Sequence, residues 1–194
     1  MADLAAVERE AIGCTRCGLA AGRTQVVFGS GDATAGLMFI GEGPGAEEDR
    51  QGIPFVGRSG QLLDRLIREE VGLDRSQVRV TNTVLCRPPG NRDPEEAELA
   101  ACWPWLESQL DLIKPVVVVT LGNFAAKRLL QTSVGVTKLR GHEYEWHGAV
   151  LVPTFHPSFI LRNGGGDYLV QMRADLVRAK QALVAAGRYP GPGA

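Results

Sequence analysis

The sequence predicts an α/β protein whose mostly parallel sheet is covered by helices on both faces. Along the 194 residues, short apolar runs rich in β-branched residues alternate with longer amphipathic stretches, as in a parallel sheet with crossover helices. Residues 116–119 form a continuous aliphatic run, which is expected of a strand buried on both faces. Hydrophobic residues make up 44% of the chain, enough for one good core.

Each element follows from its local pattern. Strands are expected in the apolar, β-rich runs at residues 37–40, 78–84, 116–121 and 150–155. Helices are expected where apolar residues recur at intervals of three and four, at residues 61–71, 94–113, 124–130 and 167–186, with a short helix before Cys14. Pro104 lies inside the second of these helices, so we expect a kink or a restart there. A hairpin is expected from residues 143–146 and 150–152.

Composition limits the class of protein. We expect residues 1–188 to form one domain and the tail 189–194 to be disordered. The formal net charge is −1, so binding to nucleic acid would depend on a local basic patch. No apolar run approaches the length of a membrane span, and the first residues lack the apolar core of a secretory signal. These observations predict a soluble cytoplasmic protein without a membrane partner, and we expect a monomer.

Four cysteines form a C-x2-C pair followed by a C-x15-C pair: Cys14, Cys17, Cys86 and Cys102. Two intervening residues let both thiolates of the first pair reach one metal centre. Four thiolates suit either zinc or an iron–sulfur cluster, and the spacing decides for neither. In the alternative interpretation, the first two cysteines are a redox pair and the other two are core residues. We favour a shared site, which would join the N-terminus to the body of the domain.

Four unusual segments fall at or near the carboxyl ends of the predicted strands. Residues 41–45 (GEGPG) follow the first strand, Asn82 lies late in the second, residues 122–123 follow the third, and His156 follows the fourth. Open parallel sheets place their ligand crevice at this edge. The segments therefore predict a single active site.

The residue types at this edge indicate the chemistry. Glu42 is a carboxylate that could polarise a water or stabilise positive charge. Phe55 could pack in the core, which the residues alone favour, or offer its face to a base. Asn82 points to the same face of its predicted strand as its apolar neighbours, so its amide is expected to be buried. A buried amide must hydrogen-bond to the backbone or recognise the edge of a ligand. His156 precedes a proline that restricts it, which makes it a rigid donor.

Acidic and basic residues nearby have a second interpretation. Glu48 and its acidic neighbours could form a solvated turn or a helix N-terminus. Arg87 and Arg92 lie in a proline-stiffened loop, and Arg162 lies near the same edge. These arginines could bind phosphates or be ordinary solvated charges.

Taken together, the motifs resemble the family-four uracil-DNA glycosylases, the iron–sulfur-containing prokaryotic branch of the uracil-DNA glycosylase superfamily. In order, they are C-x2-C, GEGPG-x-EED, PFVG-x-SGQLLD, TN-x-V-x-CRPP-x-NR, a further cysteine in a helix, and HPS-x3-R. They span nearly the whole chain.

The resemblance implies a three-layer α/β/α fold with a central four-stranded parallel sheet. It implies a 4Fe–4S cluster held by Cys14, Cys17, Cys86 and Cys102. The implied activity is hydrolysis of the N-glycosidic bond of flipped-out deoxyuridine in single- or double-stranded DNA. This reaction releases uracil and leaves an abasic site, as in base excision repair. The alternative is a non-catalytic iron–sulfur DNA-binding protein, and a redox carrier is the weaker third hypothesis.

The resemblance also implies a role for each site residue. Glu42 would position the attacking water, and His156 would donate to uracil O2. Phe55 would stack on the base, Asn82 would recognise its O4 and N3 edge, and Glu48 would stand near C5, where it would exclude thymine.

Backbone and DNA contacts complete the implied site. The backbone of Gly41 and Gly43 would line the uracil pocket. The predicted contacts to DNA are Arg87, Arg92, Ser158 and Arg162.

Overall fold

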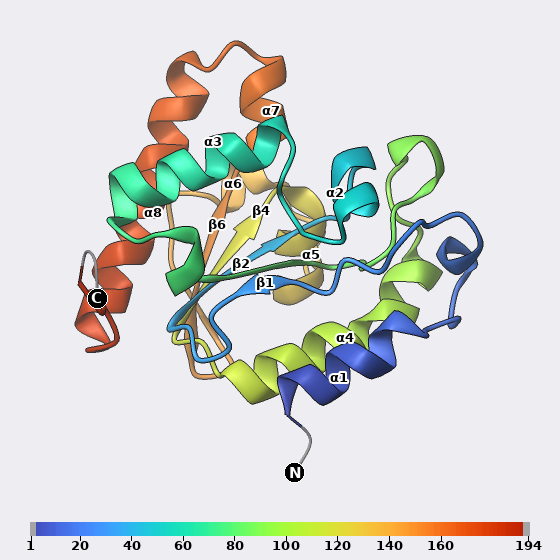
Figure 1. The fold of residues 1–194 in the computed structure, drawn as a ribbon. Coiled ribbons are helices and arrows are strands. Elements are labelled where there is room, and N and C mark those ends of the chain that lie inside the picture. Colours follow the sequence, from blue (N-terminus) through green and yellow to red (C-terminus); the bar gives the residue numbers. More distant parts are fainter. Residues whose placement is uncertain (1–2, 192–194) are drawn as a thin grey trace.

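A six-stranded sheet forms the centre of the fold. In the computed structural model, which describes residues 3–191, the strands pair in the order β1-β3-β2-β4-β6-β5 (Figure 1). The bounds are Ser30–Gly31 (β1), Leu37–Gly41 (β2), Arg79–Asn82 (β3), Val117–Leu121 (β4), Tyr144–Trp146 (β5) and Ala149–Thr154 (β6). Strands β3, β2, β4 and β6 are parallel, and β1 and β5 pair antiparallel at the two edges.

Helices cover both faces of the sheet. Side chains of a strand alternate between its faces. Leu37 and Phe39 of β2 pack with α3 (Arg58–Leu66) and α8 (Gly166–Ala185), whereas Met38 and Ile40 pack with α4 (Glu96–Ile113) and α5 (Asn123–Leu130). Figure 1 shows α3 and α8 on one side of the sheet and α1 and α4 on the other. The helices are α1 (Leu4–Ile12), α2 (Ala46–Gln51), α3 (Arg58–Leu66), α4 (Glu96–Ile113), α5 (Asn123–Leu130), α6 (Val136–Leu139), α7 (Pro157–Arg162) and α8 (Gly166–Ala185).

Over the described residues 3–191, four short helical turns complete the fold. They are η1 (Gly18–Ala21), η2 (Ile67–Val71), η3 (Arg75–Gln77) and η4 (Pro89–Asn91). The second is a π-helical turn that directly continues α3. Within residues 3–191, none of the helices combines the length and the apolar character needed to cross a membrane.

The predicted fold class is confirmed, with one correction to the sheet. Its parallel core has the expected four strands, but two antiparallel edge strands bring the total over residues 3–191 to six. Strand β5 comes from the expected hairpin. Strand β1 has two residues, too few to show an alternating pattern.

One further expectation needs correction: helix α4 continues through Pro104 without a restart, and a capping box between Glu95 and Glu98 starts it. Tyr189 belongs to the expected tail, and its hydroxyl donates to the Val71 carbonyl at 3.0 Å. Disorder of the tail 189–194 stays a prediction. Residues 192–194 of that tail lie outside the described part of the chain.

Parallel pairing brings the functional segments together. Gly41 at the end of β2 pairs with Asn82 at the end of β3, and Leu121 of β4 pairs with Thr154 of β6. All four strands therefore end at the same edge, and the loops that follow them share one region.

Candidate active site

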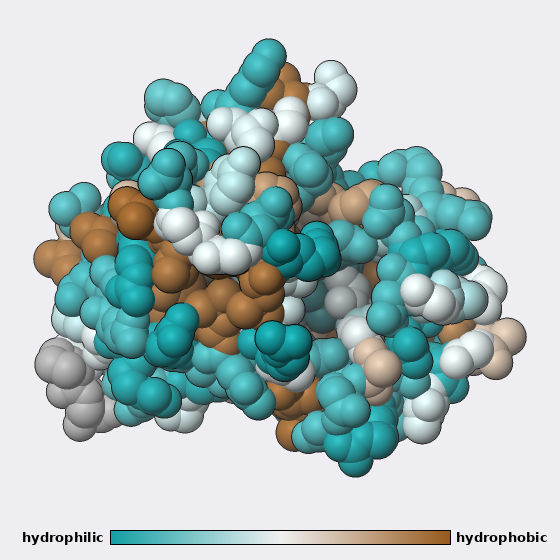
Figure 2. Space-filling view, turned by 90° about the horizontal axis from the view of Figure 1, so that it is seen from above, coloured by the Kyte–Doolittle hydropathy of each residue, from teal (hydrophilic) through white to brown (hydrophobic). Residues whose placement is uncertain are grey.

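A cavity of about 740 Å³ lies at the carboxyl end of the parallel strands. Figure 2 is seen from above relative to Figure 1 and shows a hollowed surface with a largely hydrophilic rim. Loops after β2, β3, β4 and β6 supply the lining. The predicted site residues that line the cavity are Glu42, Gly43, Glu48, Phe55, Arg92, His156, Ser158 and Arg162.

His156 is held as a neutral hydrogen-bond donor. It caps α7, and its Nδ1 accepts the Ser158 backbone N–H at 3.2 Å and lies 2.7 Å from Ser158 Oγ. This network assigns the ring proton to Nε2. Burial, with a smaller effect of Arg162, lowers the pKa of His156 to about 4. The imidazole is therefore uncharged at neutral pH.

Ser158 connects His156 to a cation. Its Oγ accepts from Arg162 Nη1 at 3.2 Å while it lies beside the imidazole. A hydroxyl can accept from one group and donate to another, so it orients the ring in one direction. The sequence predicted that Ser158 contacts DNA, and the structure shows that its hydroxyl also contacts the His156 ring.

Glu42 is a carboxyl group poised near neutrality. Burial, with the negative charge of Asp93 as the second cause, raises its pKa to about 7, and Arg162 opposes this shift. Its backbone is fixed because the Glu42 carbonyl accepts from Thr83 Oγ1 at 2.6 Å and from Val84 N at 3.1 Å. A carboxyl group with this pKa can take up and release a proton at physiological pH.

Phe55 is both a buried residue and a wall of the cavity. It is 7% exposed, and its ring centroid lies 5.6 Å from that of His156. Its φ is 55°, a left-handed conformation that costs a non-glycine residue on the order of 1–3 kcal/mol. A Cβ at Gly60 would lie 1.7 Å from the Phe55 carbonyl oxygen, so only glycine permits this close approach.

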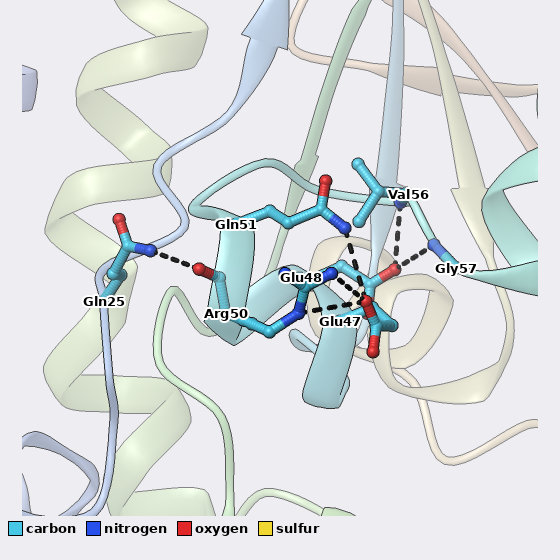
Figure 3. A network of polar contacts seen from close by, with 7 residues as sticks. All are labelled: Gln25, Glu47, Glu48, Arg50, Gln51, Val56 and Gly57. Carbon is cyan, nitrogen blue, oxygen red and sulfur yellow. Dashed lines mark hydrogen bonds and ion pairs between the residues drawn. The ribbon is translucent and has the colours of Figure 1, made fainter.

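Glu48 fixes the backbone that follows Phe55 (Figure 3). Its Oε1 accepts from Val56 N at 2.9 Å and from Gly57 N at 2.8 Å. The adjacent Glu47 instead pairs with Arg50 on the exposed side of α2. The acidic run is thus a helix N-terminus in which one carboxylate is used for loop positioning.

Asn82 lies behind the cavity wall. It is 1% exposed, and its Oδ1 has no hydrogen-bond partner among the described residues. A Cβ at Gly41 would lie 2.5 Å from this oxygen and 2.5 Å from the Phe55 ring. A buried amide oxygen without a partner is costly, typically by about 1–3 kcal/mol, unless a ligand or water satisfies it.

The cysteines form a second site. All four line one small cavity of about 10 Å³ between α1, the loop after β3 and α4. Three sulfurs each lie 3.3 Å from a different N–H donor. These pairs are Arg23 Nη1 with Cys86 Sγ, Trp105 Nε1 with Cys14 Sγ, and Leu85 N with Cys102 Sγ.

The donor chemistry of this site fits an iron–sulfur cluster. Four thiols surrounded by N–H donors match the ligands and the supporting hydrogen bonds of such clusters. Burial raises the pKa of Cys102 to about 12 and also raises that of Cys86. Within residues 3–191, no three His, Cys, Asp or Glu side chains are arranged as a group that could hold a metal ion, so the fit to a cluster rests on the donor chemistry of the four cysteines and their shared cavity.

Known proteins are similar to this chain in sequence. The model of the Uracil DNA glycosylase superfamily matches residues 28–180. The chain is 44% identical to a type-4 uracil-DNA glycosylase of Sulfurisphaera tokodaii, over 97% of this chain and 89% of that protein. It is also 44% identical to a type-4 uracil-DNA glycosylase of Thermotoga maritima, over 88% and 89%. A type-5 uracil-DNA glycosylase of Mycobacterium leprae is 35% identical over 68% and 67%.

This chain belongs to the uracil DNA glycosylase superfamily.

The arginines predicted to contact DNA differ in their exposure and in their existing side-chain partners in this superfamily member. Arg162 is exposed at the cavity rim. Arg92 makes a two-pronged ion pair with Glu98, at 2.8 and 2.6 Å, and holds the pKa of that carboxyl below its usual range. Arg87 donates from Nε to Asn91 Oδ1 at 2.7 Å. Contacts of these residues with DNA stay a prediction.

Sequence reasoning missed two contributors. Asp93 lines the cavity and raises the pKa of Glu42. Asp49, which is 4% exposed, accepts from Thr24 N at 2.8 Å and Gln25 N at 3.3 Å, and so ties α2 to the segment beside Arg23. Both effects act between segments far apart in sequence, and no local motif signals them.

Proposed function

We propose that this protein is a monofunctional uracil-DNA glycosylase. It would hydrolyse the N-glycosidic bond of a flipped-out deoxyuridine and leave an abasic site in single- or double-stranded DNA. The observation that carries the proposal is the neutral His156, whose Nδ1 accepts from the Ser158 N–H, on the wall of a cavity shared with Phe55 and Glu42.

Phe55 and Glu48 on the cavity wall, and Asn82 behind it, suit a uracil base. The Phe55 ring supplies an aromatic face for stacking. Asn82, with its unpartnered Oδ1, supplies an amide that can distinguish the N3–H and O4 edge of uracil from the amino group of cytosine. Glu48 would exclude the methyl group of thymine near C5. A site built to satisfy hydrogen bonds rejects a base that leaves those groups unpaired.

The charges suit departure of the base. Extrusion of the nucleotide costs a few kcal/mol of stacking and pairing. Bond cleavage leaves negative charge on uracil and oxocarbenium character on the sugar. The His156 Nε2–H would donate to O2 of the departing base, and ionised Glu42 would position the water and stabilise the positive sugar. Arg162, Ser158, Arg87 and Arg92 are proposed to contact the DNA backbone.

We propose a 4Fe–4S cluster as the cofactor, held by Cys14, Cys17, Cys86 and Cys102. When bound, it would act as a covalent cross-link between the N-terminal segment and the loop after β3. The four thiols and their three N–H donors support this assignment. We further propose that the protein is a cytoplasmic monomer that acts in base excision repair.

Excision of uracil from an oligonucleotide tests the proposal. The iron-loaded protein is incubated with DNA bearing one uracil, and alkali reveals abasic sites; cytosine and thymine substrates serve as controls. We expect breaks that depend on both uracil and alkali. Binding to DNA without any breaks would instead indicate a non-catalytic iron–sulfur DNA-binding protein.

Two variants test the site assignment. His156→Ala and Asn82→Ala are expected to lower the excision rate by about 1000-fold and to shift the melting temperature by only a few degrees. His142→Ala, which alters an exposed histidine, is the matched control and should excise normally. Parallel losses of activity and of folding in the two site variants would contradict the assignment.

A further inference from the structure

The backbone of Phe55 is held from both sides by charged side chains. On the far side, Glu48 binds the N–H groups of Val56 and Gly57. On the near side, Arg75 Nη2 donates to the Pro54 carbonyl at 2.6 Å. These two contacts enclose the left-handed residue that forms the cavity wall.

Arg75 lies outside the cavity but is well anchored. It belongs to η3, and its side chain is 22% exposed. Besides the Pro54 carbonyl, Nη2 donates to Ser30 Oγ at 3.1 Å, and Nη1 donates to Asp64 Oδ1 at 2.8 Å. The guanidinium therefore spans β1, α3 and the loop that carries Phe55.

The two contacts fix the two backbone dihedral angles of Phe55. Peptide units are planar, so the direction of the Pro54 carbonyl sets φ of Phe55, and the direction of the Val56 N–H sets ψ. Arg75 holds the first group and Glu48 holds the second. A strained residue persists only where its surroundings determine it in this way.

We propose that Arg75 is a positioning residue for the base pocket. By holding the Pro54 carbonyl, it keeps Phe55 in the left-handed conformation that places the ring 5.6 Å from His156. This inference rests on the proposed function, in which the Phe55 ring stacks on uracil. Without Arg75, the stacking conformation would be populated for only part of the time, and affinity for the base would fall by that fraction.

A purely structural role is the competing explanation, because Arg75 also pairs with Asp64. Asp64→Asn is the matched control: it removes the ion pair and leaves the donor to Pro54 in place. Arg75→Met removes all three contacts, those with Pro54, Ser30 and Asp64. Arg75→Lys keeps the positive charge, but an ammonium group cannot bind the Pro54 carbonyl and Asp64 in the way that the planar guanidinium does.

The first measurement is hydrogen exchange at the Val56 and Gly57 amides. We expect exchange about 10-fold faster in Arg75→Met and a smaller increase in Arg75→Lys, with wild-type rates in Asp64→Asn. Wild-type exchange in both Arg75 variants would overturn the proposal, as would equal acceleration in Asp64→Asn. If Arg75→Met does not fold, Arg75→Lys and Asp64→Asn decide alone.

The second measurement is a double-mutant cycle for uracil excision. Arg75→Met should lower kcat/KM about 10-fold in the wild-type background and less than 2-fold in Phe55→Leu, because no aromatic platform is left to position. An equal 10-fold loss in both backgrounds would overturn the proposal. A wild-type protein that does not excise uracil would contradict the proposed function. The exchange measurement needs no turnover, so its result would still decide whether Arg75 positions Phe55.

Discussion

The cavity and the cysteine site differ in what the polypeptide alone provides. The cavity has a volume of about 740 Å³, and its wall carries oriented groups such as His156 and Glu42. The cysteine site encloses about 10 Å³, and apolar residues such as Val26 and Leu85 surround its thiols. The first is open to a ligand from solution, whereas the second is too small for a free ligand and encloses four thiols.

The electrostatics of the two sites follow from this difference. Burial keeps both His156 and the Cys102 thiol uncharged at neutral pH. In the cavity, the uncharged imidazole keeps Nδ1 as an acceptor for the Ser158 N–H and leaves a single N–H donor on Nε2. In the cysteine site, the thiol would have to lose its proton to bind the proposed cluster, which would couple cluster binding to proton release and to folding. Changes in the cavity should therefore affect activity first, and changes in the cysteine site should affect stability first.

Among the variants that compare the cavity with the cysteine site, Glu42→Gln should have the largest effect, and that effect is on catalysis. We expect the excision rate at pH 8 to fall about 100-fold, because the amide cannot act as a carboxylate. In the wild type, the rate should rise with pH through about 7 as Glu42 ionises. Single-turnover excision between pH 5 and 9 measures both effects. Glu47→Gln, an exposed neighbour paired with Arg50, is the control; a flat wild-type profile would contradict the assignment.

The same variant should not lose stability at alkaline pH. The pKa of Glu42 is raised from 4.5 to about 7, so the folded state binds its proton more tightly than the unfolded state between these values. This stabilisation is complete below about pH 4.5 and is lost as the pH rises through about 7. At pH 8, Glu42→Gln should therefore melt at or above the wild-type temperature. A lower melting temperature at pH 8 would show that the carboxylate has a stabilising partner.

The next effect is on stability, in Cys102→Ser. If the cysteines hold the proposed cluster, loss of one buried ligand should lower the iron content and the melting temperature by about 10 °C. Excision per folded molecule at 20 °C should stay within about 3-fold of the wild type, because no cavity residue changes. Cys17→Ser, at a partly exposed position, is the comparison and should cost less stability. Complete loss of excision by a protein that is still folded would contradict the separation of the two sites.

The parts of the fold that could be predicted are those with a local signal. Strands β2, β4 and β6 follow from continuous apolar runs, β3 follows from alternating apolar residues, and α4 and α8 follow from helical periodicity and length. The two-residue β1 and the six-residue α2 and α7 carry too few residues for a period to be visible. Pro104 did not interrupt α4, because packing of the long helix on the sheet outweighs one lost backbone hydrogen bond.

The site was predictable where it follows strand ends and unpredictable where it depends on contacts between loops. Glu42 and His156 follow β2 and β6, so the topology of a parallel sheet brings them together. By contrast, the left-handed Phe55 depends on Gly60 and on charged groups from two other segments. Such through-space contacts leave no trace in the local sequence pattern.

The smallest effect refines the description of the cavity and concerns Asp93. Burial is the main cause of the raised pKa of Glu42, and the negative charge of Asp93 is the second. Asp93→Asn removes that charge, so Glu42 should ionise at lower pH, and the rate at pH 6 should rise about 3-fold while the rate at pH 8.5 stays unchanged. Asp111→Asn removes an exposed charge on α4 and should leave the profile unchanged. A shift of the pH–rate profile to lower pH in Asp93→Asn alone would assign the rise of the rate with pH to ionisation of Glu42 in the cavity. A shift to higher pH, or the same shift in both variants, would show that this rise does not report Glu42 beside Asp93.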